Sequence, residues 1–172
     1  MGWLRRAPIV VLLSALALSM TTGAVLAGGN PGRTPNLPLP DPYTAAMCGT
    51  DIGDVTVSVD AATFNEYIKV FTYKDGSTRL QFNGYLAQTV VGNGKTLHFN
   101  ASGPGAIFLT PDNIISRIVT QGHLFYIGPP GSPQQGLFLY TGRTVLVVLP
   151  DGIAVVSSYS GNRTDVCALL AA

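Results

Sequence analysis

The sequence predicts an all-β fold, an antiparallel up-and-down barrel of seven or eight long, glycine-bent strands with one disulfide. Three observations favour it: evenly spaced glycines, turn dipeptides midway between most of them, and two cysteines that bracket the periodic region. Glycines at one level of neighbouring strands are typical of barrel corners, where they relieve side-chain crowding on the concave face. The glycines recur every 19 or 20 residues, at Gly84, Gly103, Gly122, Gly142 and Gly161.

The turn dipeptides predict which residues lie opposite one another. A two-residue turn fixes the register of its hairpin, so each partner follows from its distance to the turn. The glycines are therefore expected to form one row across the sheet. The predicted pairs are Gly84 with Gly103 about Asn93-Gly94, Gly103 with Gly122 about Asp112-Asn113, Gly142 with Gly161 about Asp151-Gly152, and Tyr67 with Gly84 about Asp75-Gly76.

Residues 1–27 are predicted to be a secretory signal peptide. Arg5 and Arg6 precede an apolar stretch, and Val25-Leu26-Ala27 forms a small-residue cleavage site. No later segment reaches 18 uninterrupted apolar residues, so we expect no membrane span in the mature chain. An uncleaved N-terminal anchor is the alternative, and a secreted, extracellular protein is the favoured interpretation.

Residues 28–47 are predicted to be a proline-rich leader or linker, because GGNPGRTPNLPLPDPY favours extended polyproline II structure. The β-barrel domain is expected to follow over 48–172. One connection, 128–136, is much longer than a hairpin turn, and long loops often carry function. Strands are expected near 52–59, 66–73, 78–91, 96–110, 115–127, 137–149 and 153–161.

The charge balance argues against a nucleic-acid partner. Loss of Arg5 and Arg6 with the signal would leave 8 basic and 9 acidic residues, which gives no basic footprint. No phosphate-cradling glycine loop, nucleophile elbow or metalloprotease helix occurs, and no cofactor is expected.

Cys48 and Cys167 are predicted to form the disulfide, as two cysteines in an oxidising compartment most simply do. Closing a loop of this length would stabilise the fold by about 5 kcal/mol in the chain-entropy model. Seven strands of a simple meander would place the two cysteines at opposite ends of the barrel. Either an eighth strand exists, or the chain after Gly161 folds back.

The predicted register also sorts side chains by face. The glycine side is almost wholly apolar and is expected to be the core. Its members are Tyr67, Phe71, Leu80, Phe82, Leu86, Leu97, Phe99, Ile107, Leu109, Ile118, Leu124, Tyr126, Phe138, Tyr140, Leu146, Val148, Val155 and Tyr159.

The opposite side turns apolar in the later strands, which predicts an interface. The proline-rich leader, a second subunit or a small apolar ligand would cover it, and self-association into a homo-oligomer is favoured. The interface residues are Leu137, Leu139, Val145, Val147 and Leu149.

Beside the glycine row, the opposite face offers the candidates for catalysis: Glu66, Tyr85, His123 and Arg143. With Glu66 opposite Tyr85, they would supply an acid, a base and an anion holder if that face lined a lumen. The favoured interpretation is a solvated outer surface, since the glycine side is far more apolar. His98 shares this face with His123, but no carboxylate is fixed beside them and no metal site is expected.

The run from Cys48 through DGSTRLQFNGYLAQTVVGNGKTLHFNASGPG to SGNRTDVCALL resembles a group of uncharacterised, secreted, β-barrel-like actinobacterial proteins. The shared features are the paired cysteines, the DG hairpin, an N-x-S-G-P segment, a late Gly-Arg and the closing S-G…D-x-C-x-L, over roughly residues 48–170. This resemblance implies a fold and transfers no activity. More distantly, the bent strands resemble allene oxide cyclase and lipocalin barrels.

These observations favour a secreted, non-enzymatic β-barrel protein that binds a ligand or partner. One alternative is a barrel enzyme of the cyclase or isomerase type that uses the polar belt near Glu66 and His123. Another is a structural protein of the cell envelope, with the proline-rich leader spanning the wall.

Overall fold

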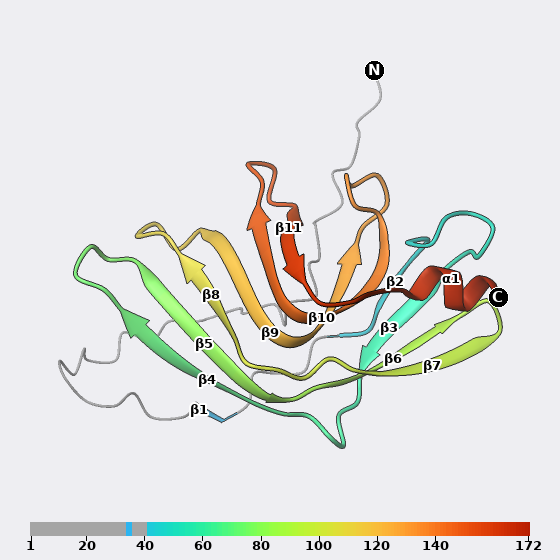
Figure 1. The fold of residues 1–172 in the computed structure, drawn as a ribbon, viewed down its shortest axis with the longest axis horizontal. Coiled ribbons are helices and arrows are strands. Elements are labelled where there is room, and N and C mark those ends of the chain that lie inside the picture. The colour runs from blue at the N-terminus through green and yellow to red at the C-terminus, as the bar shows by residue number, and fades with distance from the viewer. Residues whose placement is uncertain (1–33, 36–40) are drawn as a thin grey trace.

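Antiparallel strands make up most of the chain after Asp41 (Figure 1). The computed structural model describes residues 34–35 and 41–172; the predicted signal peptide and most of the predicted leader lie outside these residues. The described strands form an eight-stranded large sheet, in the order β1-β4-β5-β8-β9-β10-β11 with β12 also paired to β10, and a small sheet, β2-β3-β6-β7. The large sheet comprises β1 (Thr34–Pro35), β4 (Asn65–Thr72), β5 (Thr78–Tyr85), β8 (Gly105–Leu109), β9 (Ile115–Gly128), β10 (Gly136–Val148), β11 (Ala154–Ser160) and β12 (Arg163–Asp165). The small sheet comprises β2 (Tyr43–Ala45), β3 (Val55–Val59), β6 (Ala87–Gly92) and β7 (Lys95–Asn100), and one helix, α1 (Val166–Ala171), follows β12.

The predicted closed barrel is wrong. No pairing joins β1 to β11, the two ends of the large sheet, and the small sheet is likewise open among the described strands. The all-β, antiparallel class is confirmed. The barrel fails to close because the strands separate into two layers where they cross the glycine row.

The register predicted about Asn93-Gly94 is confirmed along the whole hairpin. Gly92 lies opposite Lys95, next to the turn, and Phe82 lies opposite Gly105, well beyond the bend. Asn93 and Gly94 have φ of 48° and 70°, as a two-residue hairpin turn requires. One continuous hairpin thus supplies β6 and β7 to the small sheet and β5 and β8 to the large sheet.

The glycine row bends the strands. All five glycines have positive φ, between 96° and 159°. Gly142 lies against Gly161, and a Cβ on Gly142 would collide with the carbonyl oxygen of Ser160. Only glycine allows both this conformation and this close backbone approach. We call the side of each sheet that the row faces the glycine face, and the other side the outer face.

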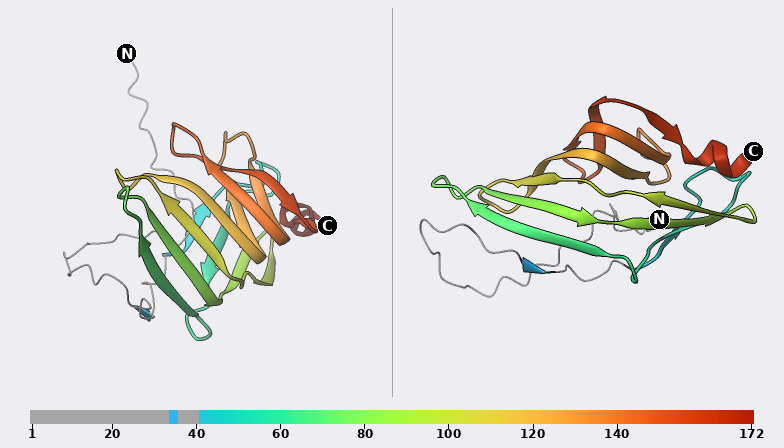
Figure 2. Two further views of the ribbon diagram at one scale, coloured as in Figure 1. Left: turned by 60° about the vertical axis from the view of Figure 1, so that its left-hand side comes forward. Right: turned by 60° about the horizontal axis from the view of Figure 1, so that its bottom comes forward.

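The two layers separate just beyond the row. Gln121 N donates to Pro104 O, and His123 N donates to Ser102 O. Further along, β7 pairs only with β6, and β9 pairs with β10. The far halves of β9 and β10 then lie over the small sheet, as the orange strands lie over the green ones in the right-hand view of Figure 2.

Separation of the layers creates a core between them. Phe125, Ile127 and Leu137, from the outer face of β9 and β10, pack with Val57 and Val90 of the small sheet. The predicted interface is therefore divided: Leu137 is fully buried and Leu139 packs against the same core, whereas the half-buried Val145, Val147 and Leu149 are not part of it. The small sheet, a cover not foreseen from the sequence, encloses the first two.

A second core lies on the glycine face of the large sheet, as predicted. Ile107, Ile118 and Leu146 pack there with Tyr126 and Tyr140. Tyr126 and Phe125 are consecutive residues that point into different cores. The far halves of β9 and β10 are therefore buried on both faces.

Three of the predicted two-residue turns are three-residue turns. Tyr73 N donates to Ser77 O, so the first loop is Lys74-Asp75-Gly76, with Gly76 at φ 83°. Pro111-Asp112-Asn113 and Pro150-Asp151-Gly152 form the same kind of loop. This loop shifts the register by one residue relative to a two-residue turn. Irregularities between Phe108 and Leu109 and between Val145 and Leu146 restore the predicted register in the later hairpins.

No bulge corrects β4, so its predicted faces are wrong. Glu66, and not Tyr67, lies opposite Gly84, while Asn65 lies opposite Tyr85. A one-residue slip exchanges the two faces of a strand. Glu66 and Ile68 consequently lie on the glycine face, and Tyr67 and Phe71 on the outer face. The bulge in β11 likewise turns Val155 away from the glycine face and buries Val156 there.

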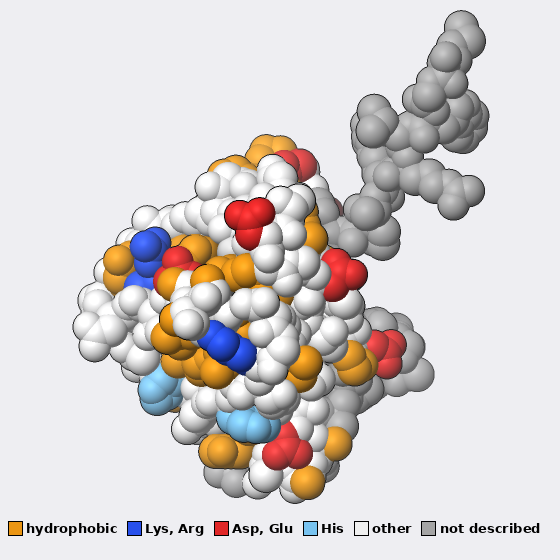
Figure 3. Space-filling view, turned by 90° about the vertical axis from the view of Figure 1, so that its right-hand side faces the viewer, with side chains coloured by type: hydrophobic (Ala, Val, Ile, Leu, Met, Phe, Trp, Pro, Cys, Tyr) orange, Lys and Arg blue, Asp and Glu red, His pale blue; other side chains and the backbone are white. Residues whose placement is uncertain are grey.

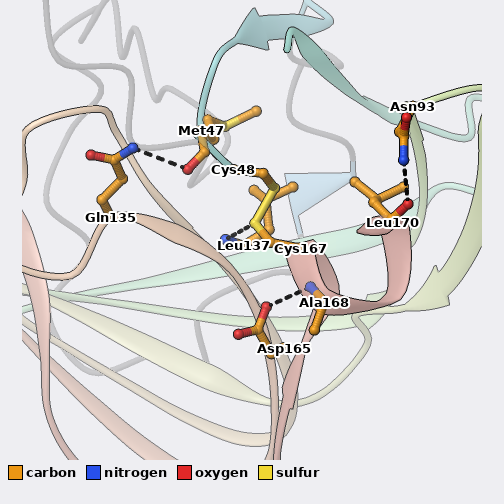
Figure 4. The surroundings of a disulfide bond; sticks show 9 residues. All are labelled: Met47, Cys48, Asn93, Gln135, Leu137, Asp165, Cys167, Ala168 and Leu170. Atoms are coloured by element: carbon orange, nitrogen blue, oxygen red, sulfur yellow. Dashed lines mark hydrogen bonds between the residues drawn. A yellow bond between two sulfur atoms is a disulfide. The ribbon is translucent and has the colours of Figure 1, made fainter. Parts of the chain in front are cut away.

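The chain after Gly161 continues along β10 as β12, in the same direction as β11, and then enters α1. It therefore neither folds back nor turns into a strand antiparallel to the seventh, and neither arrangement left open by the sequence is the observed one. The Asp165 side chain accepts from Ala168 N and caps the helix. Asn93 Nδ2 donates to Leu170 O at the other end. The predicted disulfide is confirmed: Cys48, in the loop after β2, is bonded to Cys167 of α1 (Figure 4).

Candidate functional site: an arginine-lined depression on the outer face

The four candidates for catalysis do not gather in one pocket. Glu66 faces the glycine side, whereas Tyr85, His123 and Arg143 lie on the outer face. Tyr85 is 44% exposed, Arg143 is exposed and His123 is half-buried. The expected adjacency of Glu66 and Tyr85 is therefore wrong, and the acid is separated from the base and the anion holder by the sheet itself.

Glu66 occupies an apolar position. Its side chain is only 6% exposed, and no other described residue donates a hydrogen bond to its carboxyl group. Burial raises the pKa of Glu66 to about 7. Such a carboxyl group could exchange a proton near neutral pH, but no base or anion-binding residue of the predicted belt shares its face.

The histidines occupy separate sites. His98 Nδ1 lies 3.0 Å from Thr89 Oγ1, a cross-strand neighbour on the small sheet. Histidine side chains form two separate patches in Figure 3. Within the described residues, no group of three or more His, Cys, Asp or Glu side chains gathers in a way that could hold a metal ion.

The outer face of the large sheet contains a depression of about 350 Å³. Guanidinium and amide groups stand around a small apolar floor that includes Ala106 and Val119. We call this the arginine depression. Its lining residues are Arg79, Gln81, Pro104, Gly105, Ala106, Phe108, Arg117, Val119, Gln121 and Arg143.

Strand register builds one side of the depression as an alternating row. Phe71 of β4 lies opposite Arg79 of β5, Arg79 lies opposite Phe108 of β8, and Phe108 lies opposite Arg117 of β9. Each arginine Cζ lies 4.4 Å from a ring centroid, Arg79 over Phe71 and Arg117 over Phe108. A cation–π contact of this kind contributes about 0.5–1 kcal/mol at an exposed site. The rings therefore favour these positions of the two guanidinium groups in the absence of a ligand.

The positive charge of this surface has no local counterpart. The strands present four basic residues on the outer face, Lys69, Arg79, Arg117 and Arg143, and no carboxylate. None of the three arginines forms an ion pair with another described residue. Arg79 Nε is buried and has no hydrogen-bond partner among the residues that the structure describes. Arg79 is half-buried, whereas Arg117 and Arg143 are exposed. Guanidinium groups without an ion-pair partner are well suited to bind a carboxylate or phosphate.

Part of the depression could have been found from the sequence. The register about Asn93-Gly94 and Asp112-Asn113 already places Arg79, Phe108 and Arg117 side by side, and Arg143 was among the candidates. Phe71 could not have been found, because its predicted position depended on the wrong register of β4.

A smaller hollow of about 250 Å³ lies beside the disulfide. Gln135 Nε2 donates to Met47 O across it, and Leu137 N donates to Cys167 Sγ. These contacts fasten the long 128–136 connection to the disulfide (Figure 4). Among its described lining residues only Asp165 is charged, so these residues form no convergent set of binding groups.

Comparison with known proteins adds no assignment. The chain matches no family model, no curated protein and no solved structure. None of the helical segments in the described part of the chain has the length and hydrophobicity needed to cross a membrane.

Proposed function

We propose that the chain is a secreted, non-enzymatic binding protein that takes up an anionic ligand at the arginine depression. The observation that carries this proposal is the set of three guanidinium groups around one hollow without a carboxylate among them. The planar guanidinium group of arginine binds carboxylates and phosphates with two parallel hydrogen bonds.

A cyclase or isomerase would need Glu66 to share a pocket with His123 or Arg143. These groups lie on opposite faces of the sheet, so the binding function is the better supported of the two. A role as a structural protein of the cell envelope differs in location, and fractionating a culture into medium and envelope separates it from a freely released binding protein.

Isothermal titration calorimetry of the exported protein at low salt tests the proposal, with citrate, inorganic phosphate and a carboxylated glycan as ligands. We expect saturable binding that weakens as salt is added. Arg117→Ala should weaken binding about tenfold or more, since a hydrogen bond to a charged group contributes about 1.5–3 kcal/mol.

Lys74→Ala is the matched control, because Lys74 is an exposed cation in the β4–β5 turn outside the depression. Binding to this variant should be unchanged. Equal losses in the two variants, or no saturable binding to any of the three ligands, would contradict the proposal.

A further inference from the structure

We propose that the ligand is an extended acidic glycan, a polymer in which carboxylate-bearing sugars alternate with uncharged ones. This inference rests on the proposed anion-binding function and names the chemistry of the ligand at the same site.

The positive charges of the arginine depression are widely spaced. Arg79 and Arg117 are two strands apart in one row, about 10 Å at the usual strand separation. Both lean the same way, each over the ring of the preceding strand, so this separation is kept at their guanidinium groups. One small anion would not reach both groups.

The line of charges extends in two directions. Arg143 lies opposite Gln121, four residues along β9 from Arg117, which places it roughly 13 Å further along the strands. Lys69 lies opposite Gln81, beside Arg79 on the other side. A ligand that pairs with all of these residues must carry negative charges at wide intervals along a chain.

Amide groups and small apolar side chains lie between the charges. Gln81 and Gln121 offer amide groups that both donate and accept hydrogen bonds. Sugar hydroxyls also do both, whereas the bridging and terminal oxygens of a polyphosphate only accept. The apolar floor at Ala106 and Val119 suits the C–H faces of sugar rings. Polyphosphate also carries its charges much more closely than these arginines are spaced.

Calorimetry with hyaluronan oligosaccharides of two, four and six sugars tests the inference, because this glycan alternates uronate with an uncharged amino sugar. We expect affinity to rise about tenfold with each added carboxylate, since the second contact becomes intramolecular. Polyphosphate of equal total charge and neutral dextran should bind at least tenfold more weakly than the hexasaccharide.

Two variants distinguish a loss of binding at the arginine residues from a loss caused by misfolding. Arg79→Ala should lower hexasaccharide affinity about tenfold and disaccharide affinity less than twofold. Gln81→Glu, at an exposed position, should repel the hexasaccharide to a similar extent while leaving the circular dichroism spectrum unchanged. The latter variant tests the site even if removal of Arg79 disturbs folding.

The outcomes distinguish the two proposals. If affinity does not depend on the length of the oligosaccharide, the proposal of an extended polymeric ligand is wrong, but the anion-binding function stands. If polyphosphate binds more tightly than the hexasaccharide, the proposal that the ligand is a glycan is wrong. No saturable binding of citrate, phosphate or glycan would overturn both.

Discussion

Replacement of Glu66 by glutamine should stabilise the fold at alkaline pH and leave it nearly unchanged in acid. Burial raises the pKa of this carboxyl group from 4.5 to about 7, so the folded protein favours its protonated form. Each pKa unit corresponds to about 1.4 kcal/mol of folding free energy, which makes the full effect roughly 3 kcal/mol. Glutamine keeps the shape of the side chain and never ionises.

The sign follows from the direction of the pKa change. The contribution of Glu66 to stability is fully present below pH 4.5, where the carboxyl group is protonated in both the folded and the unfolded chain. It is lost as the pH rises through about 7, because the folded chain must then bury a charge. Above that pH the loss is complete and the stability no longer changes through this group.

Urea unfolding followed by circular dichroism, at several pH values between 4 and 9 with the disulfide intact, measures the effect. The unaltered protein should lose roughly 3 kcal/mol more than the Glu66→Gln protein between the two ends of this range. Asp54→Asn is the control, since Asp54 is an exposed carboxylate, and its profile should follow that of the unaltered protein. Parallel profiles for all three proteins would refute the assignment of Glu66 to an apolar, uncompensated position.

Three further predictions concern the bend, the disulfide and the outer face. Gly142→Ala should lower the unfolding free energy measured in urea by more than 2 kcal/mol, because a Cβ at this position meets the backbone of β11. Gly94 also has positive φ but lies in open space, so Gly94→Ala should lower it by only about 1 kcal/mol. Equal losses would mean that backbone crowding is not the reason for glycine at position 142. Replacing Cys48 and Cys167 together by serine should lower the unfolding free energy by about 5 kcal/mol. A reductant should produce the same loss in calorimetry of the unaltered protein. An unchanged melting temperature would contradict a stabilising role of the disulfide. Val147→Lys should convert the homo-oligomer predicted from the outer face into a monomer in light scattering, and a monodisperse monomer before mutation would end that prediction.

The sequence could predict what depends on local turn chemistry. The Asn93-Gly94 hairpin, the glycine row and the two-sided apolar character of β9 and β10 follow from alternation and from the demands of tight turns. The disulfide followed from there being two cysteines around one periodic region.

The remaining features depend on choices that short sequence patterns do not encode. Asp-Gly occurs in both two-residue and three-residue turns, so the face of Glu66 could not be derived from Asp75-Gly76 alone. Whether strands bent at glycines close into a ring or separate into layers depends on long-range packing, here of Phe125 and Leu137 against the small sheet. The hydrophobic pattern indicated that these residues needed a cover, but it could not show that the cover belonged to the same chain.

The double burial of the β9–β10 hairpin has a consequence for the order of folding. One face of the hairpin packs on the small sheet. In the same core, Val55 of β3 packs with Val166 and Leu170 of α1, and β3 and α1 are separated by more than 100 residues in the sequence. Contacts of such long sequence separation form late, because a long loop must close before they contribute any stability. The small sheet can therefore gain its final packing only after α1 has emerged, and until then β3 and β6 expose apolar surface. A chain that crosses a membrane from its N-terminal end would spend this interval partly folded, when its strands are most exposed to aggregation.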